Sequence, residues 1–177
     1  METTYYIERV TSQRNLVPGL VELTTNVVEG GASVGFMLPV SQMKILNFWK
    51  RVLIRVEQGE IILIIARDTI SNTIIGTVQL VLDLPENQPH RAEVAKMQVL
   101  SHARNQGVGG MLLKTIEDEA VKAGKSLLVL DTATGSPAEK LYASHGWKRV
   151  GEIPFYALYP NGSLCNTTFF FKSLSMN

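Results

Sequence analysis

Three glycines between an apolar stretch and an amphipathic stretch could hold a phosphate group. Gly107, Gly109 and Gly110 follow the apolar residues 94–100 and precede residues 111–123, whose apolar side chains recur at helical spacing. A strand, a glycine-rich turn and a helix in this order bring unpaired backbone N–H groups together with the positive end of a helix dipole. Glycines without a Cβ let a phosphate approach that backbone closely. The sequence therefore predicts a pyrophosphate site here.

Two common nucleotide-binding motifs do not match the chain. The dinucleotide fingerprint G-x-G-x-x-G/A, counted from Gly107, has Leu112 at its last position, where close packing of the helix needs glycine or alanine. The phosphate loop G-x-x-x-x-G-K-S/T is imitated by residues 124–126, but Glu119 stands where its first glycine belongs. Those residues also end a helix and begin a strand, which is the reverse of the required order.

The glycine run resembles the acetyl-CoA loop of the GNAT N-acetyltransferases. The signature of that family, (R/Q)-x-x-G-x-(G/A), is matched by Arg104, Gly107 and Gly109. Residues 138–147 resemble a second family segment, A-x-x-L-Y-x-x-x-G-F, with Trp147 in place of phenylalanine. The two segments lie in the family's order and at its usual separation. The resemblance implies an acyltransferase that moves an acetyl group from acetyl-CoA to an amine.

The resemblance also implies where acetyl-CoA binds. In the GNAT fold two adjacent parallel strands splay apart, and the pantetheine arm of the cofactor pairs with one of them; here the strands would be residues 91–100 and 126–132. Unpaired N–H and C=O groups on an open strand edge are satisfied by the two pantetheine amides. The expected cofactor-binding residues are Met97, Gln98, Val99, Arg104, Asn105, Gln106, Gly107, Val108, Gly109, Gly110, Ser136 and Tyr142.

Acetyl transfer needs a base for the amine, a donor for the oxyanion and an acid for the leaving thiolate. Tyr142 matches the family position often assigned as the acid, and a backbone N–H near Val99 is the expected oxyanion donor. Glu93, at the start of one splayed strand, and Asp131, at the end of the other, are two candidate bases. Either carboxylate could accept a proton once burial raises its pKa towards neutrality. The sequence leaves the choice between them open.

Residues 28–37 form a glycine-rich connection that resembles a loop of one family member acting on a β-lactam antibiotic. We expect Gly31, Ser33 and Phe36 of this connection to bind the acetyl acceptor. The acceptor would be a small molecule with an amine or hydroxyl group, such as an antibiotic or toxin of β-lactam type. Two alternatives remain: a protein N-terminal or lysine acetyltransferase, and an acyl-CoA-binding sensor without catalysis.

Hydrophobic periodicity predicts the elements that position these residues. The expected order is a strand, two helices, three strands, a helix, a strand, a helix and two strands. It matches an α/β (α+β) GNAT fold with a mixed, mostly antiparallel seven-stranded sheet, helices on both faces and a splayed parallel strand pair. The last helix should be capped by Ser136 and end at Gly146. One domain should span residues 1–177.

Composition excludes several other classes of protein. A net charge of +1 gives no basic surface for nucleic acid or a membrane. The single cysteine, Cys165, cannot form an internal disulfide, no run approaches the ~20 apolar residues of a membrane span, and no signal-type apolar segment begins the chain. We therefore expect a cytoplasmic enzyme, for which a homodimer is allowed. His90, His102 and His145 are too scattered for a metal site.

Overall fold

The computed structural model describes residues 4–11 and 15–175. The strands of this part are β1 (Tyr5–Arg9), β2 (Ile61–Asp68), β3 (Ile74–Val81), β4 (Arg91–Val99), β5 (Leu127–Ala133), β6 (Lys148–Leu158) and β7 (Leu164–Ser173). Its α-helices are α1 (Leu16–Glu29), α2 (Gln42–Glu57), α3 (Val108–Lys122) and α4 (Pro137–Ser144), and a 3₁₀ turn covers Ser101–Ala103. The expected domain also includes residues 1–3, 12–14 and 176–177, which lie outside the described residues.

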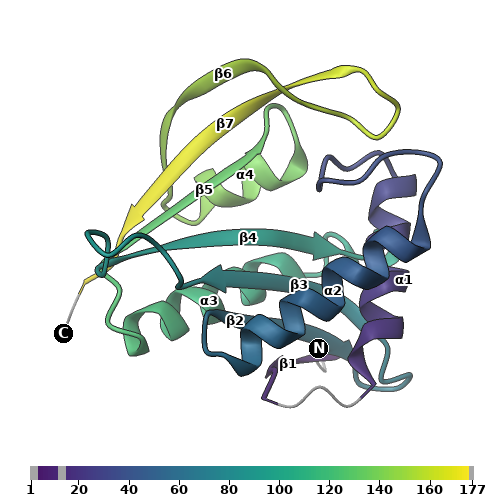
Figure 1. The fold of residues 1–177 in the computed structure, drawn as a ribbon, viewed down its shortest axis with the longest axis horizontal. Coiled ribbons are helices and arrows are strands. Elements are labelled where there is room, and N and C mark those ends of the chain that lie inside the picture. Colours follow the sequence, from purple (N-terminus) through teal and green to yellow (C-terminus); the bar gives the residue numbers. More distant parts are fainter. Residues whose placement is uncertain (1–3, 12–14, 176–177) are drawn as a thin grey trace.

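The strands form one seven-stranded sheet in the described chain, in the order β1-β2-β3-β4-β5-β7-β6. All neighbouring strands are antiparallel except β4 and β5, which run parallel and pair only over residues 91–93 and 127–129. Beyond these pairs the two strands diverge, so the sheet opens like a V (Figure 1). The expected mixed sheet with a splayed parallel pair is confirmed.

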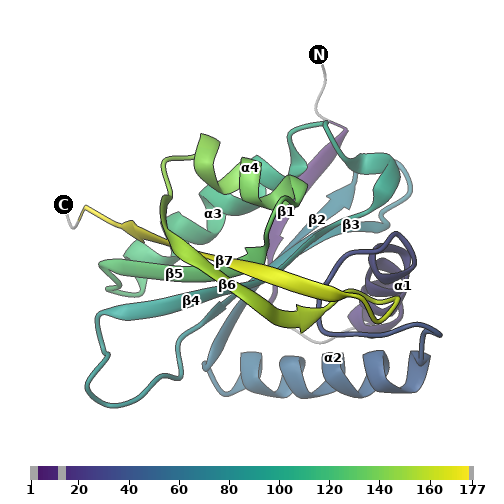
Figure 2. The same cartoon turned by 90° about the horizontal axis from the view of Figure 1, so that it is seen from above.

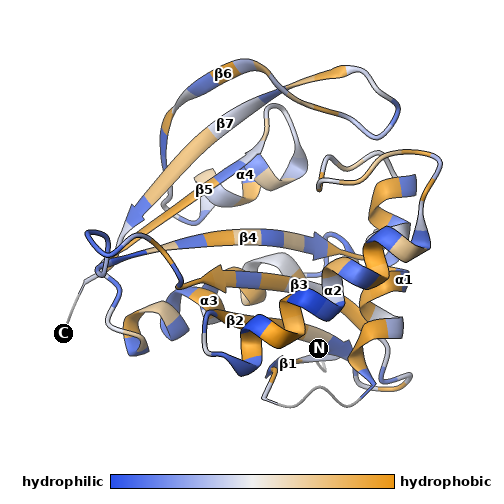
Figure 3. Cartoon of the chain, in the orientation of Figure 1, coloured by the Kyte–Doolittle hydropathy of each residue, from blue (hydrophilic) through white to orange (hydrophobic). Residues whose placement is uncertain are grey.

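Helices cover both faces of the sheet. Helices α1 and α2 lie on one face, against β2, β3 and β4, and α3 and α4 lie on the other (Figure 2). Strands β2 and β3 are therefore buried on both faces, and their residues are mostly apolar (Figure 3). A strand with one solvated face would instead alternate between apolar and polar side chains.

A β-bulge interrupts β4 where the sheet opens. Gln79 of β3 pairs with Ala95, whereas Thr77, two residues away, pairs with Gln98. Lys96 and Met97 thus both lie opposite a single residue, and Lys96 takes a left-handed backbone conformation with φ of 53°. Bulges bend a strand and redirect a side chain, and a non-glycine residue with positive φ is strained.

A buried polar chain ties α2 and α1 to β4. The indole N–H of Trp49 donates to Thr24 Oγ1 at 2.9 Å, and the Thr24 hydroxyl donates to Gln98 Oε1 at 2.9 Å. All three side chains are buried. Such a chain fixes the position of β4 next to its bulge, because each polar group would be left without a partner if the helices shifted.

The connection between α1 and α2 is fastened to the hairpin of β6 and β7. The Ser33 hydroxyl donates to the Leu158 carbonyl at 2.9 Å, and the Leu38 N–H donates to the Pro160 carbonyl at 2.9 Å. These contacts bring the connection to the open end of the V (Figure 1). None of the helices in residues 4–11 and 15–175 has the length and apolar character needed to cross a membrane.

Candidate active site

The predicted phosphate site lies at the N-terminus of α3. Gly107 caps the helix in a left-handed conformation with φ of 84°, and Asn105, two residues earlier, has φ of 60°. No side chain of the described residues caps this helix. The backbone N–H groups of its first turn are therefore available to an anion, and the helix dipole favours a negative charge there. The segment from Arg104 to Gly107 is exposed to solvent.

Helix α3 begins three residues earlier than the predicted start at residue 111. Gly109 and Gly110 therefore lie inside the first turn of the helix rather than in the loop. A Cβ on Gly109 would lie 3.1 Å from Leu141 Cδ2, and one on Gly110 would lie 2.9 Å from His145 Nε2. The predicted start was wrong because these glycines also serve close packing against α4, which periodicity does not reveal.

The glycine run contacts the end of β4. The Arg104 side chain donates through Nε to the Val99 carbonyl at 3.2 Å, and a Cβ on Gly109 would lie 4.0 Å from Val99 Cγ2. On one side, Gln98 and Val99 pair with β3. On the other side, no strand of the described chain pairs with β4 beyond residue 93. The edge of β4 thus leads from the predicted phosphate site into the opening of the V.

Tyr142, on α4, is buried beside this opening. Its ring packs against Trp147, with centroids 5.8 Å apart, and against Phe170 of β7, with centroids 6.1 Å apart. Trp147 is held in turn by a hydrogen bond from its indole N–H to Glu117 Oε1 of α3, at 2.8 Å. Burial, and then the negative charge of Asp131, raise the pKa of Tyr142 well above its usual range. The hydroxyl therefore stays protonated at neutral pH and can donate a hydrogen bond.

The two candidate bases share one face of the sheet. Glu93 lies opposite Val129 of β5, and Asp131 follows on the same face two residues, or roughly 7 Å, further along that strand. Glu93 forms an ion pair with Arg91 at 2.9 Å. Asp131 forms none within the described residues. Asp131 is exposed to solvent as a residue, but partial desolvation of its carboxyl and the neighbouring charge of Glu93 raise its pKa, while Lys96 opposes this rise.

The Ser136 hydroxyl has a structural partner. It caps α4 by accepting a hydrogen bond from the Glu139 N–H at 3.3 Å, and it lies 3.3 Å from Thr132 Oγ1 of β5. The predicted cap of this helix is confirmed. Across the described parts of the chain, no three histidine, cysteine, aspartate or glutamate side chains are grouped to hold a metal ion.

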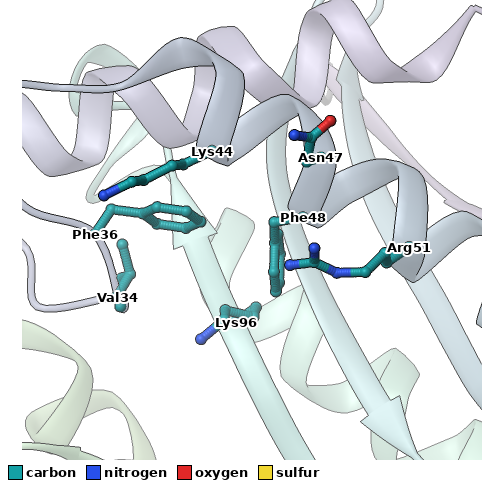
Figure 4. A pocket seen from close by; sticks show the side chains of 8 residues that line it. Val34, Phe36, Lys44, Asn47, Phe48, Arg51 and Lys96 are labelled. Carbon is teal, nitrogen blue, oxygen red and sulfur yellow. The ribbon is translucent and has the colours of Figure 1, made fainter.

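A cavity of about 350 Å³ opens between α2, the α1–α2 connection and the bulge of β4. Figure 4 shows Phe36 and Phe48 as its aromatic walls, with Lys96 reaching in from β4. The rings of Phe36 and Phe48 meet edge to face, with centroids 5.6 Å apart. The residues that line the cavity are Val34, Gly35, Phe36, Lys44, Asn47, Phe48, Arg51 and Lys96.

Residues 58–149, more than half of the chain, match the acetyltransferase (GNAT) domain family. The chain belongs to the GNAT acetyltransferases. This match confirms the family resemblance of the glycine run and of the segment around Tyr142. It also confirms the expectation of an acyltransferase that uses acetyl-CoA as its acetyl donor.

Solved structures of other GNAT enzymes share the whole fold of this GNAT chain. A ribosomal-protein-alanine N-acetyltransferase from Brucella melitensis superimposes with a TM-score of 0.77 at 20% identity, covering 96% of this chain and 99% of that one. A GCN5-related N-acetyltransferase from Kribbella flavida gives 0.78 at 19% identity, with coverages of 97% and 98%. A phosphinothricin acetyltransferase from Sinorhizobium meliloti, solved with acetyl-CoA, gives 0.78 at 15% identity, with coverages of 97% and 89%.

The predicted acceptor loop of this GNAT chain reaches the cavity with only part of its length. Phe36 lines the cavity, whereas Gly31 and Ser33 do not. Gly31 has a left-handed φ of 87°, with open space where a Cβ would stand, and the Ser33 hydroxyl is engaged by Leu158. The role of these two residues in binding the acceptor stays a prediction.

Sequence reasoning missed most of the cavity in this GNAT chain. It did not select Lys44, Asn47, Phe48, Arg51 or Lys96. The first four recur at positions i, i+3, i+4 and i+7 of one predicted helix, a spacing that places them on one face. That pattern was a usable signal. Nothing in the sequence marks Lys96, because its inward direction follows from the bulge in β4.

Proposed function

We propose that this GNAT enzyme acetylates the amine of a small molecule by direct attack on acetyl-CoA in a ternary complex. One observation carries the proposal. The gap between β4 and β5 connects the anion site at α3 with Tyr142 and Asp131, and it lies beside a cavity large enough for a small acceptor. A cavity of about 350 Å³ falls within the usual range for small-molecule sites.

The cofactor-binding residues of the proposal follow the gap. The first-turn N–H groups of α3, which have no side-chain cap, and the exposed turn from Arg104 to Gly107 would hold the pyrophosphate. The edge of β4 from Met97 to Val99, which pairs with no described strand on the side of the gap, would pair with the pantetheine amides. When bound, acetyl-CoA supplies an activated thioester. Such a ligand needs a strand edge for its pantetheine arm and an anion site for its pyrophosphate. The gap would offer both, at separate places.

The chain's own groups would then manage the protons. We favour Asp131 over Glu93 as the base, because partial desolvation raises the pKa of the Asp131 carboxyl whereas the Glu93 carboxylate is engaged by Arg91. Asp131 would take a proton of the amine, directly or through a water, as the amine nitrogen bonds to the acetyl carbon and the bond from that carbon to the CoA sulfur breaks. The Val99 N–H would stabilise the oxyanion. Tyr142 would donate its proton to the departing sulfur.

Two features support a small acceptor. The α1–α2 connection, bound to Leu158 and Pro160, crosses the open end of the V, where a long peptide would have to lie. Residues 30–36 also resemble the corresponding loop of tabtoxin resistance protein, which acetylates a β-lactam antibiotic. An acceptor of this antibiotic or toxin class is therefore the first to examine.

The edge strand β6 and the buried Cys165 bear on assembly and on location. Strand β6, at the edge of the sheet, exposes several large apolar side chains, among them Phe155 at 68% and Val150 at 67%. This edge is consistent with a homodimer, and sedimentation equilibrium would show a monomer at all concentrations if that expectation is wrong. The lone buried Cys165 fits a cytoplasmic enzyme, since a reducing compartment leaves such a thiol free.

The proposal is tested by measuring CoA-thiol release from acetyl-CoA with a panel of small amines, β-lactam amines and short peptides. Acetyl-CoA binding is followed beside it by thermal shift. Release with small amines but not with peptides supports the proposal. Release with peptides alone makes the chain a protein acetyltransferase, and acetyl-CoA binding without release for any acceptor makes it an acyl-CoA sensor.

A further inference from the structure

The charges in the cavity are all of one sign. Lys44, Arg51 and Lys96 line it, and none of its described lining residues is acidic. None of the salt bridges found within residues 4–11 and 15–175 involves any of the three. The whole chain carries a net charge of only +1, so this concentration of positive charge is local to the cavity.

Helix α2 presents two of these cations along one face. Lys44 and Arg51 are seven residues, or roughly 10 Å, apart, and Asn47 and Phe48 lie between them on the same face. Asn47 adds an amide that can donate to an anion, and Phe48 adds an apolar wall. A guanidinium, an amide and an ammonium around an apolar wall suit an organic molecule with one anionic end.

Lys96 approaches the same space from β4. Its strained backbone at the bulge directs the side chain under α2, where Nζ lies 5.6 Å from the centre of the Phe48 ring (Figure 4). Burial lowers the pKa of Lys96, because the groups around its ammonium only partly replace the water that would stabilise the charge. The ring offers a weak cation–π contact, and the charge of Asp131 acts from the neighbouring strand. An anion in the cavity would stabilise the ammonium group further.

The pyrophosphate of acetyl-CoA does not account for this charge. The anion site at α3 belongs to the face of the sheet opposite α2. The cavity instead opens on the α1–α2 face, which it shares with the polar chain from Trp49 to Gln98. Lys96, which lines the cavity, interacts with the charge of Asp131, so we assign the cavity to the acceptor's half of the site.

We propose that the acetyl acceptor carries an oxyanion, such as a carboxylate or a phosphonate, in addition to its amine. Arg51 and Lys44 bind the oxyanion at the mouth of the cavity, and Phe36 and Phe48 enclose the carbon chain. Lys96 lies between the oxyanion and the reacting amine, which points towards Asp131. This inference rests on the proposed function, because it names the class of acceptor for the same site.

The test compares matched acceptors that differ only in charge. Straight-chain ω-amino carboxylates of two to six carbons, their primary amides and the corresponding aminoalkyl phosphonates are assayed for CoA-thiol release. One charge-assisted contact predicts a kcat/KM for the best anionic acceptor about tenfold to a hundredfold above that of its amide. The carboxylate and phosphonate arms identify which oxyanion the cavity prefers. Equal values for acids and amides would overturn the inference.

Variants of α2 then locate the binding site. Arg51→Gln and Lys44→Gln should raise KM for the anionic acceptor about tenfold, with little change for the amide or in the affinity for acetyl-CoA. Lys50→Gln is the matched control, since Lys50 is exposed on the same helix and does not line the cavity. If Lys50→Gln lowers the acid preference as much as Arg51→Gln does, a general charge effect replaces the specific site and the inference fails.

Calorimetry separates the inference from the proposed function. Binding of each acid and its amide is measured on the protein loaded with CoA, without any turnover. If the acid binds more tightly than the amide, and this difference depends on Arg51, the anion site is supported. That result would hold even if no amine is acetylated and the proposed function fails. Turnover of amines with no preference for acids in either assay keeps the proposed function and refutes the anion site.

Discussion

Asn105→Asp adds one negative charge beside the N-terminus of α3 while hardly changing the shape of the side chain. Asn105 is exposed and has a left-handed φ of 60°, a conformation that aspartate also tolerates. The helix begins three residues later, at Val108, and carries no side-chain cap from the described residues. A carboxylate near its positive end should leave the fold unchanged or stabilise it by ~0.3–1 kcal/mol.

The same charge should weaken the binding of acetyl-CoA. Asn105 is two residues, or at most about 7 Å of backbone, from Gly107, and we take about 7 Å as the separation between the new carboxylate and an anion on the first helical turn. For each unit of phosphate charge, repulsion at that distance is about 0.6 kcal/mol in water and about 2.4 kcal/mol at an effective dielectric constant of 20. The Kd for acetyl-CoA should therefore rise about 3-fold to 60-fold.

Asn15→Asp provides the matched control. Asn15 is also an exposed asparagine with φ of 58° at the start of a helix. It lies eleven residues, or roughly 16 Å along α1, from Asn26, whose side chain contacts Ser101 near the glycine run. That distance exceeds the screening length of about 8 Å at physiological salt.

The assay is calorimetric titration of both variants with acetyl-CoA at two salt concentrations, with thermal unfolding of the free proteins. The expected result is a loss of affinity for Asn105→Asp alone, larger at low salt, with melting temperatures equal to or above that of the original chain. Unchanged affinity of Asn105→Asp at low salt would refute the location of the pyrophosphate at α3.

Three further substitutions test the proposed acid, the proposed base and the buried polar chain. Tyr142→Phe should lower kcat by about 10²-fold with the fold preserved, because it removes only the acid; a change of less than threefold across the pH range would make Tyr142 structural. Lys96→Met should move the acidic limb of the kcat–pH profile to higher pH, because Lys96 opposes the raised pKa of Asp131 and its loss lets that pKa rise further; an unmoved limb would exclude Asp131 as the base. Thr24→Val should lower the free energy of unfolding by about 2–5 kcal/mol, because it leaves two buried polar groups unpaired, and chemical denaturation compared with Thr24→Ser, which keeps the hydroxyl, would detect this.

The sequence predicted the elements well because their signals are local. Alternating and helical periods, the Ser136 cap and the turns at glycine and asparagine depend on neighbours within a few residues, and the mixed sheet with its splayed parallel pair followed from the family resemblance. The glycine run was also predicted as a turn before a helix. Its end was misplaced because Gly109 and Gly110 are required by α4, which lies about thirty residues away in the chain.

The cavity could not be predicted in the same way. Lys96 lies in a bulge of β4 that no local pattern in the sequence announces, so the place of its side chain next to α2 could not be predicted from alternation. Likewise, the sequence predicts that the Ser33 hydroxyl is available to the acceptor, whereas in the fold this hydroxyl donates a hydrogen bond to the Leu158 carbonyl. In both cases the outcome depends on tertiary pairing between segments with no local signal for each other.

The hydrogen bond between Ser33 and Leu158 spans 125 residues of chain, whereas the strand edge and the glycine run lie next to each other in sequence. Contacts between nearby residues form early, while closing a long loop carries a larger entropic penalty. The α1–α2 connection should therefore assemble last during folding and open first in the native state, since its hydrogen bonds to the hairpin of β6 and β7 are few and exposed. Amide hydrogen exchange should then be faster at Leu38 than in β4. The proposed acetyl-CoA site at β4 and α3 would stay folded while the α1–α2 connection opens and closes.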